Sequence, residues 1–231
     1  MRAVIEIRNL DYSHPGGIRA LTDINLTVLE GENLVLFGPN GSGKTTLLLH
    51  LNGTLRGDGH LRVAGLEVNK ENLAEVRRRV GIVFQESDEQ LFMPTVLEDV
   101  MFGPLNLGWG HDRAERCSRE ALRAVGIAPE LISRPPFHLS AGEKRRVALA
   151  GVLVMEPHLL LLDEPTTSLD PPGQRTLLNL LQQFPQTKII ATHDVHFAAA
   201  MSTRAVFLDG GRIVAEGEVT ELAERFGWNP L

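Results

Sequence analysis

A glycine-rich segment at residues 38–45 is the first part of this sequence whose residue types and spacing could do chemistry. It fits the pattern G-x-x-x-x-G-K-[ST], and it lies between a buried strand predicted at 33–37 and a helix predicted at 44–51. Glycines let backbone N–H groups turn toward one point, where the positive end of the helix dipole also lies. A turn that merely connects the strand to the helix is the alternative, but the complete motif in this setting favours a phosphate site.

Each residue of this segment has an expected role at a nucleotide. Lys44 should reach the β- and γ-phosphates, Thr45 should offer its hydroxyl to Mg²⁺, and Thr46 should meet the α-phosphate or cap the helix. The residues expected to bind the nucleotide here are Gly38, Pro39, Asn40, Gly41, Ser42, Gly43, Lys44, Thr45 and Thr46.

Two carboxylates follow a run of leucines at 159–162. The run predicts a strand covered on both faces, so Asp163 and Glu164 should emerge at the ligand-bearing edge of the sheet. Asp163 is suited to holding Mg²⁺ through a water, and Glu164 to acting as general base toward an attacking water. An acidic pair that caps a helix before Pro165 is the alternative.

A third segment, residues 139–143, resembles the signature sequence Leu-Ser-Gly-Gly-Gln of the nucleotide-binding subunits of ATP-binding cassette (ABC) transporters. The resemblance implies that Ser140 and Gly142 close over ATP bound to a second subunit, in a head-to-tail dimer with two shared sites. Ala141 and Glu143 depart from that pattern. Ser140 and Glu143 also fit a capping box, and both interpretations can hold together. We expect Glu143 to turn back to its own helix as a cap.

The same resemblance assigns roles to four residues between and beyond these segments. Tyr12 is similar to the aromatic residue that stacks on adenine, and Gln85 to the glutamine that touches Mg²⁺. Asp170 belongs to a segment, 168–170, that resembles the loop crossing the dimer interface. His193 resembles the histidine that hydrogen-bonds the γ-phosphate. His193 and His196 could instead bind a metal, but a single cysteine, Cys117, and the lack of another dense histidine cluster leave too few ligands.

Composition limits the class of protein. The chain has 231 residues, 43% of them hydrophobic, which is enough for a sizeable core, and its net charge of −6 gives no basic surplus for nucleic acid. It has no run of about 18 apolar residues and no signal pattern, so we expect a cytoplasmic protein that does not span the membrane.

Periodicity predicts an α/β fold, and the resemblance implies a P-loop NTPase cassette. Strands are expected in an antiparallel β subdomain (4–9, 24–29 and 60–63) and in a mostly parallel core (33–37, 80–84, 159–163 and 187–192). Helices at 112–125 and 143–154, with no strand between 95 and 155, predict an inserted α-helical subdomain at about 95–155 of a single domain spanning 1–231. A hairpin at 205–215 and a short helix ending at Phe226 complete the chain.

Residues 85–92, 94–107 and 144–157 strongly resemble the ATPase subunits of energy-coupling factor (ECF) transporters. The resemblance covers nearly the whole chain and implies an ATPase that energises an importer of cobalt or nickel ions from the cytoplasmic face of the cell membrane. ATP and Mg²⁺ are the implied cofactors. The implied partners are a transmembrane coupling subunit, a membrane substrate-binding subunit and a second ATPase subunit, either identical or related.

Other functions stay open at this point. An ECF importer of vitamins or another ABC transporter would share most of these motifs. A soluble cassette ATPase acting on DNA or ribosomes would normally show a long coiled coil, tandem cassettes or a basic surface, and none is visible.

Acidic residues surround an apolar stretch, 91–93, in the region where the ECF family docks the coupling helices of its membrane subunit. A helix with an apolar face and an arginine would suit such a surface, although a solvated acidic loop is the alternative. We expect one or two of Asp88, Glu89 and Glu98 to pair with a partner arginine. The acidic residues of this stretch are Glu86, Asp88, Glu89, Glu98 and Asp99.

Overall fold

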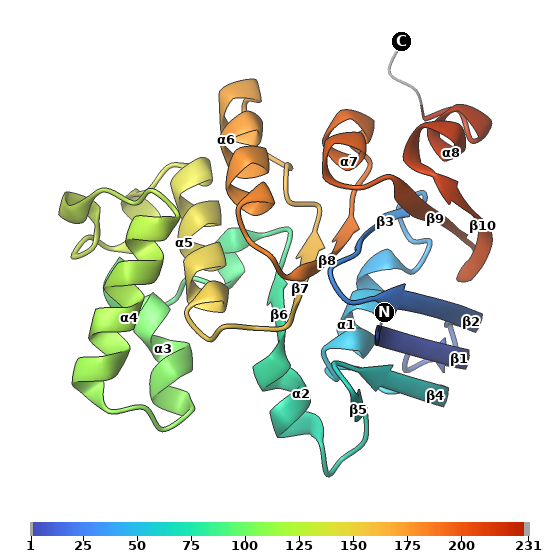
Figure 1. The fold of residues 1–231 in the computed structure, drawn as a ribbon, viewed down its shortest axis with the longest axis horizontal. Coiled ribbons are helices and arrows are strands. Elements are labelled where there is room, and N and C mark those ends of the chain that lie inside the picture. The colour runs from blue at the N-terminus through green and yellow to red at the C-terminus, as the bar shows by residue number, and fades with distance from the viewer. Residues whose placement is uncertain (1, 229–231) are drawn as a thin grey trace. The chain divides into compact units, whose positions relative to one another are not determined.

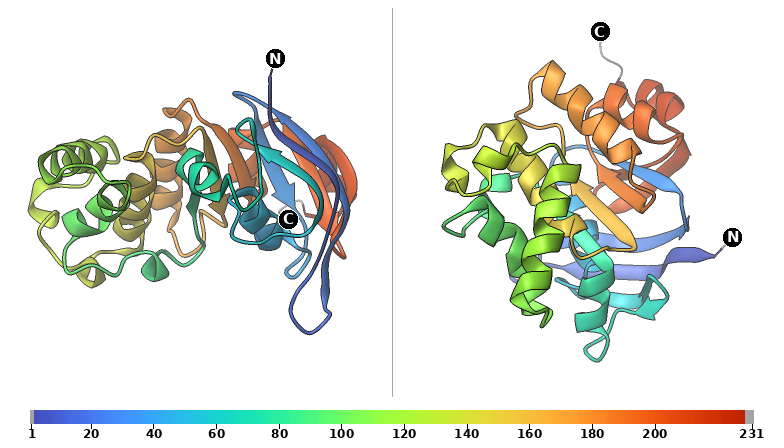
Figure 2. Two further views of the ribbon diagram at one scale, coloured as in Figure 1. Left: turned by 90° about the horizontal axis from the view of Figure 1, so that it is seen from below. Right: turned by 60° about the vertical axis from the view of Figure 1, so that its left-hand side comes forward.

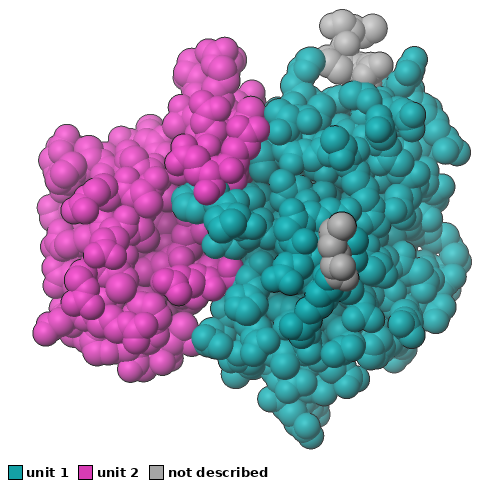
Figure 3. Space-filling view, viewed as in Figure 1, with its two compact units in different colours: residues 1–82, 158–164, 184–231 teal, residues 83–157, 165–183 magenta. Residues whose placement is uncertain are grey.

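The computed structural model describes residues 2–228, which form two compact units (Figure 3). The first unit contains residues 2–82, 158–164 and 184–228, and the second contains 83–157 and 165–183. The second unit therefore includes the region predicted to be an inserted helical subdomain and extends beyond it at both ends. None of the helices within residues 2–228 has the length and apolar character needed to cross a membrane.

A four-stranded antiparallel sheet begins the first unit (Figures 1 and 2). Its order is β2 (Arg19–Leu29), β1 (Ala3–Ser13), β4 (Asp58–Val63) and β5 (Leu66–Glu67). Ile5, Ile7 and Leu26 are among the strand residues buried in the core. They join Leu48 and Leu51 of helix α1 (Lys44–Leu51) in one hydrophobic cluster. The three antiparallel strands predicted from the sequence are confirmed.

A six-stranded mixed sheet carries the first two sequence motifs. Its order is β10 (Arg212–Glu218), β9 (Arg204–Asp209), β3 (Asn33–Phe37), β8 (Thr187–Ala191), β7 (Leu159–Asp163) and β6 (Val80–Val83). Strands β3, β7, β8 and β9 pair in parallel, whereas β9 and β10 form the predicted antiparallel hairpin. All residues of β7 and β8 are buried, as their aliphatic runs predict. The glycine-rich loop thus follows the carboxyl end of β3, and Asp163 is the last residue of β7.

Helices α2 (Leu73–Arg79), α7 (Val195–Met201) and α8 (Val219–Arg225) complete the first unit. Helix α8 ends next to Phe226, where the sequence places the end of a short helix. Phe226 stacks on Phe207 of β9 with a ring centroid distance of 3.7 Å, so this last helix is held on the sheet by aromatic packing.

The second unit is helical. Helices α3 (Val96–Asn106), α4 (His111–Ala124) and α5 (Ala141–Leu153) lie against one another, and α6 (Pro171–Gln182) follows Asp170 (Figure 1). Short 3₁₀ turns span Ser87–Glu89, Pro129–Leu131 and Pro136–His138. Helices α4 and α5 confirm the two helices predicted from periodicity. Helix α3 was not predicted: it carries Pro104 in its last turn, where the missing N–H interrupts the pattern of a regular helix.

Candidate nucleotide-binding site

The glycine-rich loop takes a conformation that only glycine can support. Gly38 has φ 146° and Gly43 has φ 106°, both in the left-handed region. A Cβ atom would lie 2.1 Å from the Leu208 carbonyl oxygen at Gly38, and 2.7 Å from the Ala20 carbonyl oxygen at Gly43. The loop therefore passes close to neighbouring backbone on both sides before α1 begins at Lys44, so its path is fixed.

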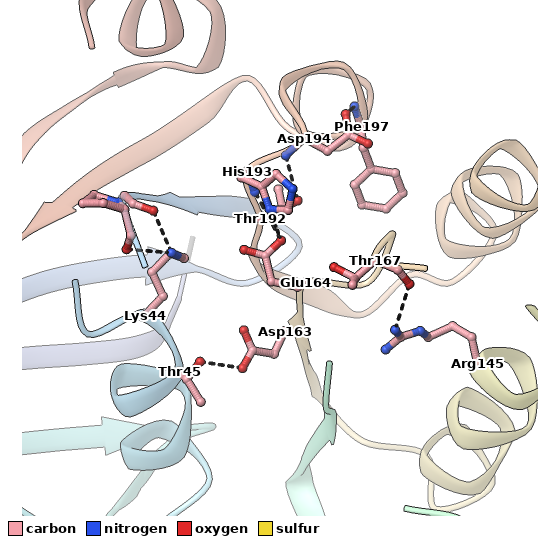
Figure 4. A network of polar contacts seen from close by, with 12 residues as sticks. Lys44, Thr45, Arg145, Asp163, Glu164, Thr167, Thr192, His193, Asp194 and Phe197 are labelled. Carbon is pink, nitrogen blue, oxygen red and sulfur yellow. Dashed lines mark hydrogen bonds and ion pairs between the residues drawn. The ribbon is translucent and has the colours of Figure 1, made fainter. Parts of the chain in front are cut away.

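Lys44 is buried and directed back at the loop (Figure 4). Its Nζ donates to the carbonyl oxygens of Gly38, at 2.7 Å, and Pro39, at 3.2 Å. Burial lowers the pKa of this amine, and the nearby carboxylates of Glu164 and Asp163 partly oppose that shift. The ammonium group thus stands at the mouth of the loop, bound to carbonyls that an anionic phosphate could replace.

Thr45 and Asp163 meet across two elements. The Thr45 hydroxyl, in the first turn of α1, donates to Asp163 Oδ2, at the end of β7, over 2.7 Å (Figure 4). A hydroxyl and a carboxylate are the oxygen ligands that Mg²⁺ prefers, and they lie beside the loop that would hold the phosphates. The donor set therefore fits Mg²⁺ bound with a nucleotide.

Glu164 and His193 form a second contact at the same sheet edge. Glu164 stands at φ 44°, in the left-handed region, and its side chain is only 9% exposed. Its Oε2 accepts from the His193 backbone N–H at 3.3 Å and lies 2.8 Å from His193 Nδ1. The imidazole is 62% exposed, so a buried carboxylate is covered by a ring that faces outward. A strained backbone of this kind is typical of functional sites.

Tyr12 lies among rings of the first unit. Its ring packs edge-on against His50 of α1, at 4.7 Å between centroids, and against His14, at 5.1 Å. His14 Nε2 in turn lies 3.5 Å from the Thr46 hydroxyl. Tyr12 is thus placed near the loop through α1, and its role toward adenine stays a prediction. His14 was missed by sequence reasoning, and its position two residues after Tyr12, directly after β1 ends, is the signal that could have found it.

The signature segment forms a capping box at the start of α5. The Ser140 side chain accepts from the Glu143 N–H at 3.4 Å, while Glu143 Oε2 accepts from the Ser140 N–H at 2.8 Å and its hydroxyl at 2.7 Å. The hydrogen bonds from Ser140 lower the pKa of Glu143. The expectation that Glu143 turns back to its own helix is confirmed. Ala141 is the first residue of α5, where a methyl group is readily accepted.

Gln85 and Asp170 are fixed through their surroundings in the second unit. The Gln85 carbonyl accepts a hydrogen bond from Arg145 of α5, at 2.7 Å. Asp170 Oδ1 accepts from the Gly173 N–H at 2.9 Å and so caps α6. Two residues earlier, Ser168 stands at φ 65°. Arg145 was also missed by sequence reasoning, although an arginine on the apolar side of a helix, four residues before Leu149, is a signal of a buried charge.

The structure thus brings the predicted residues together in two groups. The first unit carries the glycine-rich loop, Lys44, Thr45, Thr46, Asp163, Glu164, His193 and Tyr12. The second unit carries Gln85, Ser140, Gly142 and Asp170. The residues of the first group contact one another through the Thr45–Asp163 and Glu164–His193 pairs. This group offers a loop of N–H donors, an amine, a hydroxyl–carboxylate pair and a buried carboxylate, which are groups suited to phosphate chemistry.

Sequence comparison agrees with this arrangement. Residues 21–167 match the family model of the ABC transporter. The chain is 48% identical over 223 residues to the cobalt import ATP-binding protein CbiO of Rhodobacter capsulatus, covering 94% of this chain and 79% of that protein. It is 44% identical over 225 residues to the energy-coupling factor transporter ATP-binding protein EcfA of Methanothermobacter thermautotrophicus, covering 95% of this chain and 72% of that protein.

Solved structures show the same fold. The structure of CbiO1 from Clostridium perfringens, described as part of an ABC transporter complex, matches with a TM-score of 0.86 and 35% identity over 98% of this chain and 92% of that one. A dimeric ATP-binding cassette bound to ADP and Pi matches with a TM-score of 0.82 and 27% identity over 93% of this chain and 98% of that one. The predicted fold class and the resemblance to ECF ATPases are confirmed. The chain belongs to the ABC transporter family, as one of its ATP-binding subunits.

Proposed function

We propose that this chain is the ATPase subunit that energises an ECF-type importer of cobalt or nickel ions. The observation that carries the proposal is the first group of residues, in which the phosphate loop, the Thr45–Asp163 pair and the Glu164–His193 pair occur together in one unit. The similarity to a cobalt import protein over nearly the whole chain supports the cargo.

In the proposed reaction, the loop N–H groups and Lys44 bind the phosphates of ATP, and Tyr12 contacts the adenine. Thr45 and Asp163, with Gln85, would hold Mg²⁺, which supplies charge that offsets the negative phosphates. Glu164 accepts a proton from the attacking water, and its contact with His193 orients the carboxylate toward that water. His193, being mostly exposed, is suited to a hydrogen bond with the γ-phosphate.

The second group of residues acts on ATP of a neighbouring subunit in this proposal. Ser140 and Gly142 lie at the N-terminal end of α5, where backbone N–H groups and the helix dipole favour a phosphate. Asp170, at the start of α6, belongs to the segment expected to cross the interface. ATP then joins two cassettes, and hydrolysis releases them. The dimeric cassette of the same fold supports this mode of action.

A coupling surface in the second unit is suited to a membrane partner that holds this chain at the cytoplasmic face of the membrane. It surrounds a hollow of about 610 Å³ and exposes two aromatic rings, with Phe92 62% and Phe137 72% exposed. We define the coupling surface by its lining residues, Asp88, Leu91, Phe92, Met93, Pro94, Pro135, Pro136, Phe137 and Lys144. An apolar helix carrying an arginine would bury the rings and pair with an acidic residue at the margin.

The contacts of the acidic residues narrow the choice of partner for that arginine. Asp99 is buried and accepts from the N–H groups of Phe92 and Met93, both at 3.0 Å, so it shapes the surface from inside. Glu98 accepts from the Thr95 hydroxyl at 2.7 Å within the cap of α3. Asp88 pairs with Lys144 at 2.7 Å but is 69% exposed. Asp88 and Glu89 are therefore the best candidates.

Affinity purification from native membranes tests the proposal. Tagged Glu164→Gln chain, isolated in mild detergent with ATP, should bring with it a transmembrane coupling subunit and a small membrane substrate-binding subunit, identified by mass spectrometry. Membrane vesicles prepared in the same way should take up radioactive cobalt or nickel when they contain the wild-type chain, and should not when they contain the Glu164→Gln chain. Recovery of soluble or nucleic-acid-bound partners alone would overturn a transport role. Uptake of a vitamin instead of metal would change the assigned cargo and leave the assignment to an ECF transporter in place.

A further inference from the structure

Arg145 of α5 connects backbone segments that are far apart in the sequence. Its side chain donates to the carbonyl oxygens of Phe84, at 2.6 Å, and Gln85, at 2.7 Å. It also donates to the carbonyl of Thr167, at 3.4 Å, from the same nitrogen that reaches Gln85 (Figure 4). Only 4% of the residue is exposed. Since a buried charge is costly unless it is hydrogen-bonded, these contacts are part of what keeps the guanidinium in the fold.

The three segments that meet at Arg145 are those expected to face ATP from the second unit. Gln85 is the predicted Mg²⁺ contact, Thr167 stands immediately before the segment 168–170, and Arg145 lies five residues after Ser140 on α5. Between them is a small cavity of about 130 Å³, lined by Gln85, Ala141, Arg145, Thr167, Ser168 and their neighbours. A cavity at this place means that the guanidinium bridges segments that do not pack fully against one another.

We propose that Arg145 is a positioning residue that holds the Gln85 loop and the segment 168–170 at fixed positions relative to the N-terminal end of α5, where the signature segment lies. The three ligand-facing segments of the second unit then respond together when ATP binds or the membrane partner moves. This inference rests on the proposed function. It adds a residue that touches neither ATP nor the partner but sets the position of residues that do.

The geometry requires an arginine. The planar guanidinium presents several N–H donors in a fixed fork, so one side chain can reach the successive carbonyls of Phe84 and Gln85 and also the Thr167 carbonyl. A lysine ammonium at the same position has three donors on a single nitrogen atom, so it cannot reproduce the fork in which two nitrogens bind the carbonyls of Phe84, Gln85 and Thr167. Ser168, next to Thr167, stands at φ 65°, and a fixed carbonyl before it helps to hold that strained turn.

The test compares Arg145→Met and Arg145→Lys with a matched control, Arg119→Met. Arg119 lies in α4 of the same unit and pairs with Glu115 at 2.8 Å, but its side chain is 47% exposed. Three measurements are made on the full chain: fluorescent-nucleotide affinity, kcat and KM for ATP, and ATP-dependent dimerisation in a Glu164→Gln background. Stimulation of ATP hydrolysis by the membrane partner is measured in the whole transporter.

Arg145→Met should leave nucleotide affinity within about twofold of wild type, because the phosphate loop belongs to the first unit. It should lower kcat by about tenfold to a hundredfold, as a misplacement of about 1 Å can. ATP-dependent dimerisation and partner stimulation should fall with kcat, while Arg119→Met behaves as wild type. Arg145→Lys should also show lowered kcat and dimerisation, because lysine keeps the positive charge but lacks the guanidinium's fork of N–H donors.

Wild-type kcat and dimerisation in either Arg145 variant would overturn the proposal. If Arg145→Met fails to fold, as judged by its circular dichroism, the lysine variant decides the outcome, since it keeps the buried charge. An equal loss in nucleotide affinity and in kcat would mean a general structural role and would also overturn it. A wild-type chain that neither hydrolyses ATP nor binds a membrane partner would instead show failure of the proposed function.

Discussion

Glu164 shows how a single side chain is prepared for chemistry in this protein. The backbone turns into the left-handed region directly after β7, and its N–H donates to the Ala191 carbonyl of β8 at 2.8 Å. The carboxylate is then buried and held against both the ring and the backbone N–H of His193. Such a conformation costs about 1–3 kcal/mol, and it persists because the neighbouring strands impose it. The residue proposed as general base is thus positioned by the sheet itself.

This contact predicts that Glu164 and His193 act as one unit. Glu164→Gln and His193→Ala should each lower kcat, by about 10²-fold to 10⁴-fold for the general base. The double variant should lose less than the product of the two, with a coupling energy of about 0.5–3 kcal/mol, because each change also removes what the other residue contacts. Single-turnover ATP hydrolysis by the four proteins gives the cycle. Strictly additive losses would mean that the 2.8 Å contact has no part in hydrolysis.

Helix α5 combines three structural features along its length. Its first turn follows Ser140 of the signature segment, its second turn places Arg145, and apolar residues on more than one side, including Val147 and Leu149, are buried in the second unit. The capping box fixes where the helix begins, because the side chains of Ser140 and Glu143 satisfy N–H groups that the helix leaves unpaired. A departure from the family signature, Glu143, is therefore explained by the local structure of the helix.

The cap makes a prediction about pH. Hydrogen bonds from Ser140 lower the pKa of Glu143 from 4.5, so the folded state favours the charged carboxylate. Its stabilisation should be fully present above pH 4.5 and should be lost as the pH falls through the lowered folded-state pKa. In urea unfolding, wild type should exceed Glu143→Ala in stability above that pH, and the gap should narrow in acid.

Glu120→Ala, at an exposed position of α4, serves as the control for the removal of a surface carboxylate. Glu143→Gln keeps an oxygen that can accept from the Ser140 N–H, and it should fall between wild type and the alanine variant. Its ATP affinity should not rise several-fold, since the native carboxylate faces its own helix. A several-fold rise would argue that Glu143 points at the nucleotide and would contradict the cap.

At the scale of the whole molecule, the residues with expected roles are divided between the two units. The first unit holds the phosphate loop and both carboxylates expected at the γ-phosphate, on the carboxyl ends of a mixed sheet. The second unit holds the signature, Gln85 and the coupling surface. In the proposed function the coupling surface contacts the membrane partner, so variants on that surface should affect partner binding more than ATP hydrolysis by the isolated chain.

Charge reversal at Asp88 of the coupling surface, or at Glu89 next to it in the sequence, tests that difference. Either Asp88→Arg or Glu89→Arg should weaken binding to the membrane partner by about 30-fold or more, because losing one charge of a buried interfacial pair costs about 2–5 kcal/mol. Metal uptake by the whole transporter should fall with it, while ATP hydrolysis by the isolated chain survives. Co-purification and uptake assays measure the first two effects. Glu120→Arg is the control, and loss of hydrolysis in the isolated variants would contradict the separation of roles.

Local patterns in the sequence determined much of this protein. The glycine-rich loop, the run of leucines before Asp163 and the capping box are encoded within a few neighbouring residues, so their elements could be predicted without the rest of the chain. Helix α3 could not be predicted in this way, because Pro104 interrupts its helical pattern.

Tertiary structure alone decided the contacts that make the residues useful. Thr45 and Asp163 are 118 positions apart in the sequence, and Arg145 and Gln85 are 60 positions apart. No local sequence pattern predicts which residues come into contact over such separations. The left-handed backbone at Glu164, the burial of Asp99 and the pairing of Asp88 with Lys144 likewise follow from packing. Sequence thus determined which side chains are present and in what local structure, whereas long-range burial and hydrogen bonding decided which of them meet, because those energies exist only once the chain is folded.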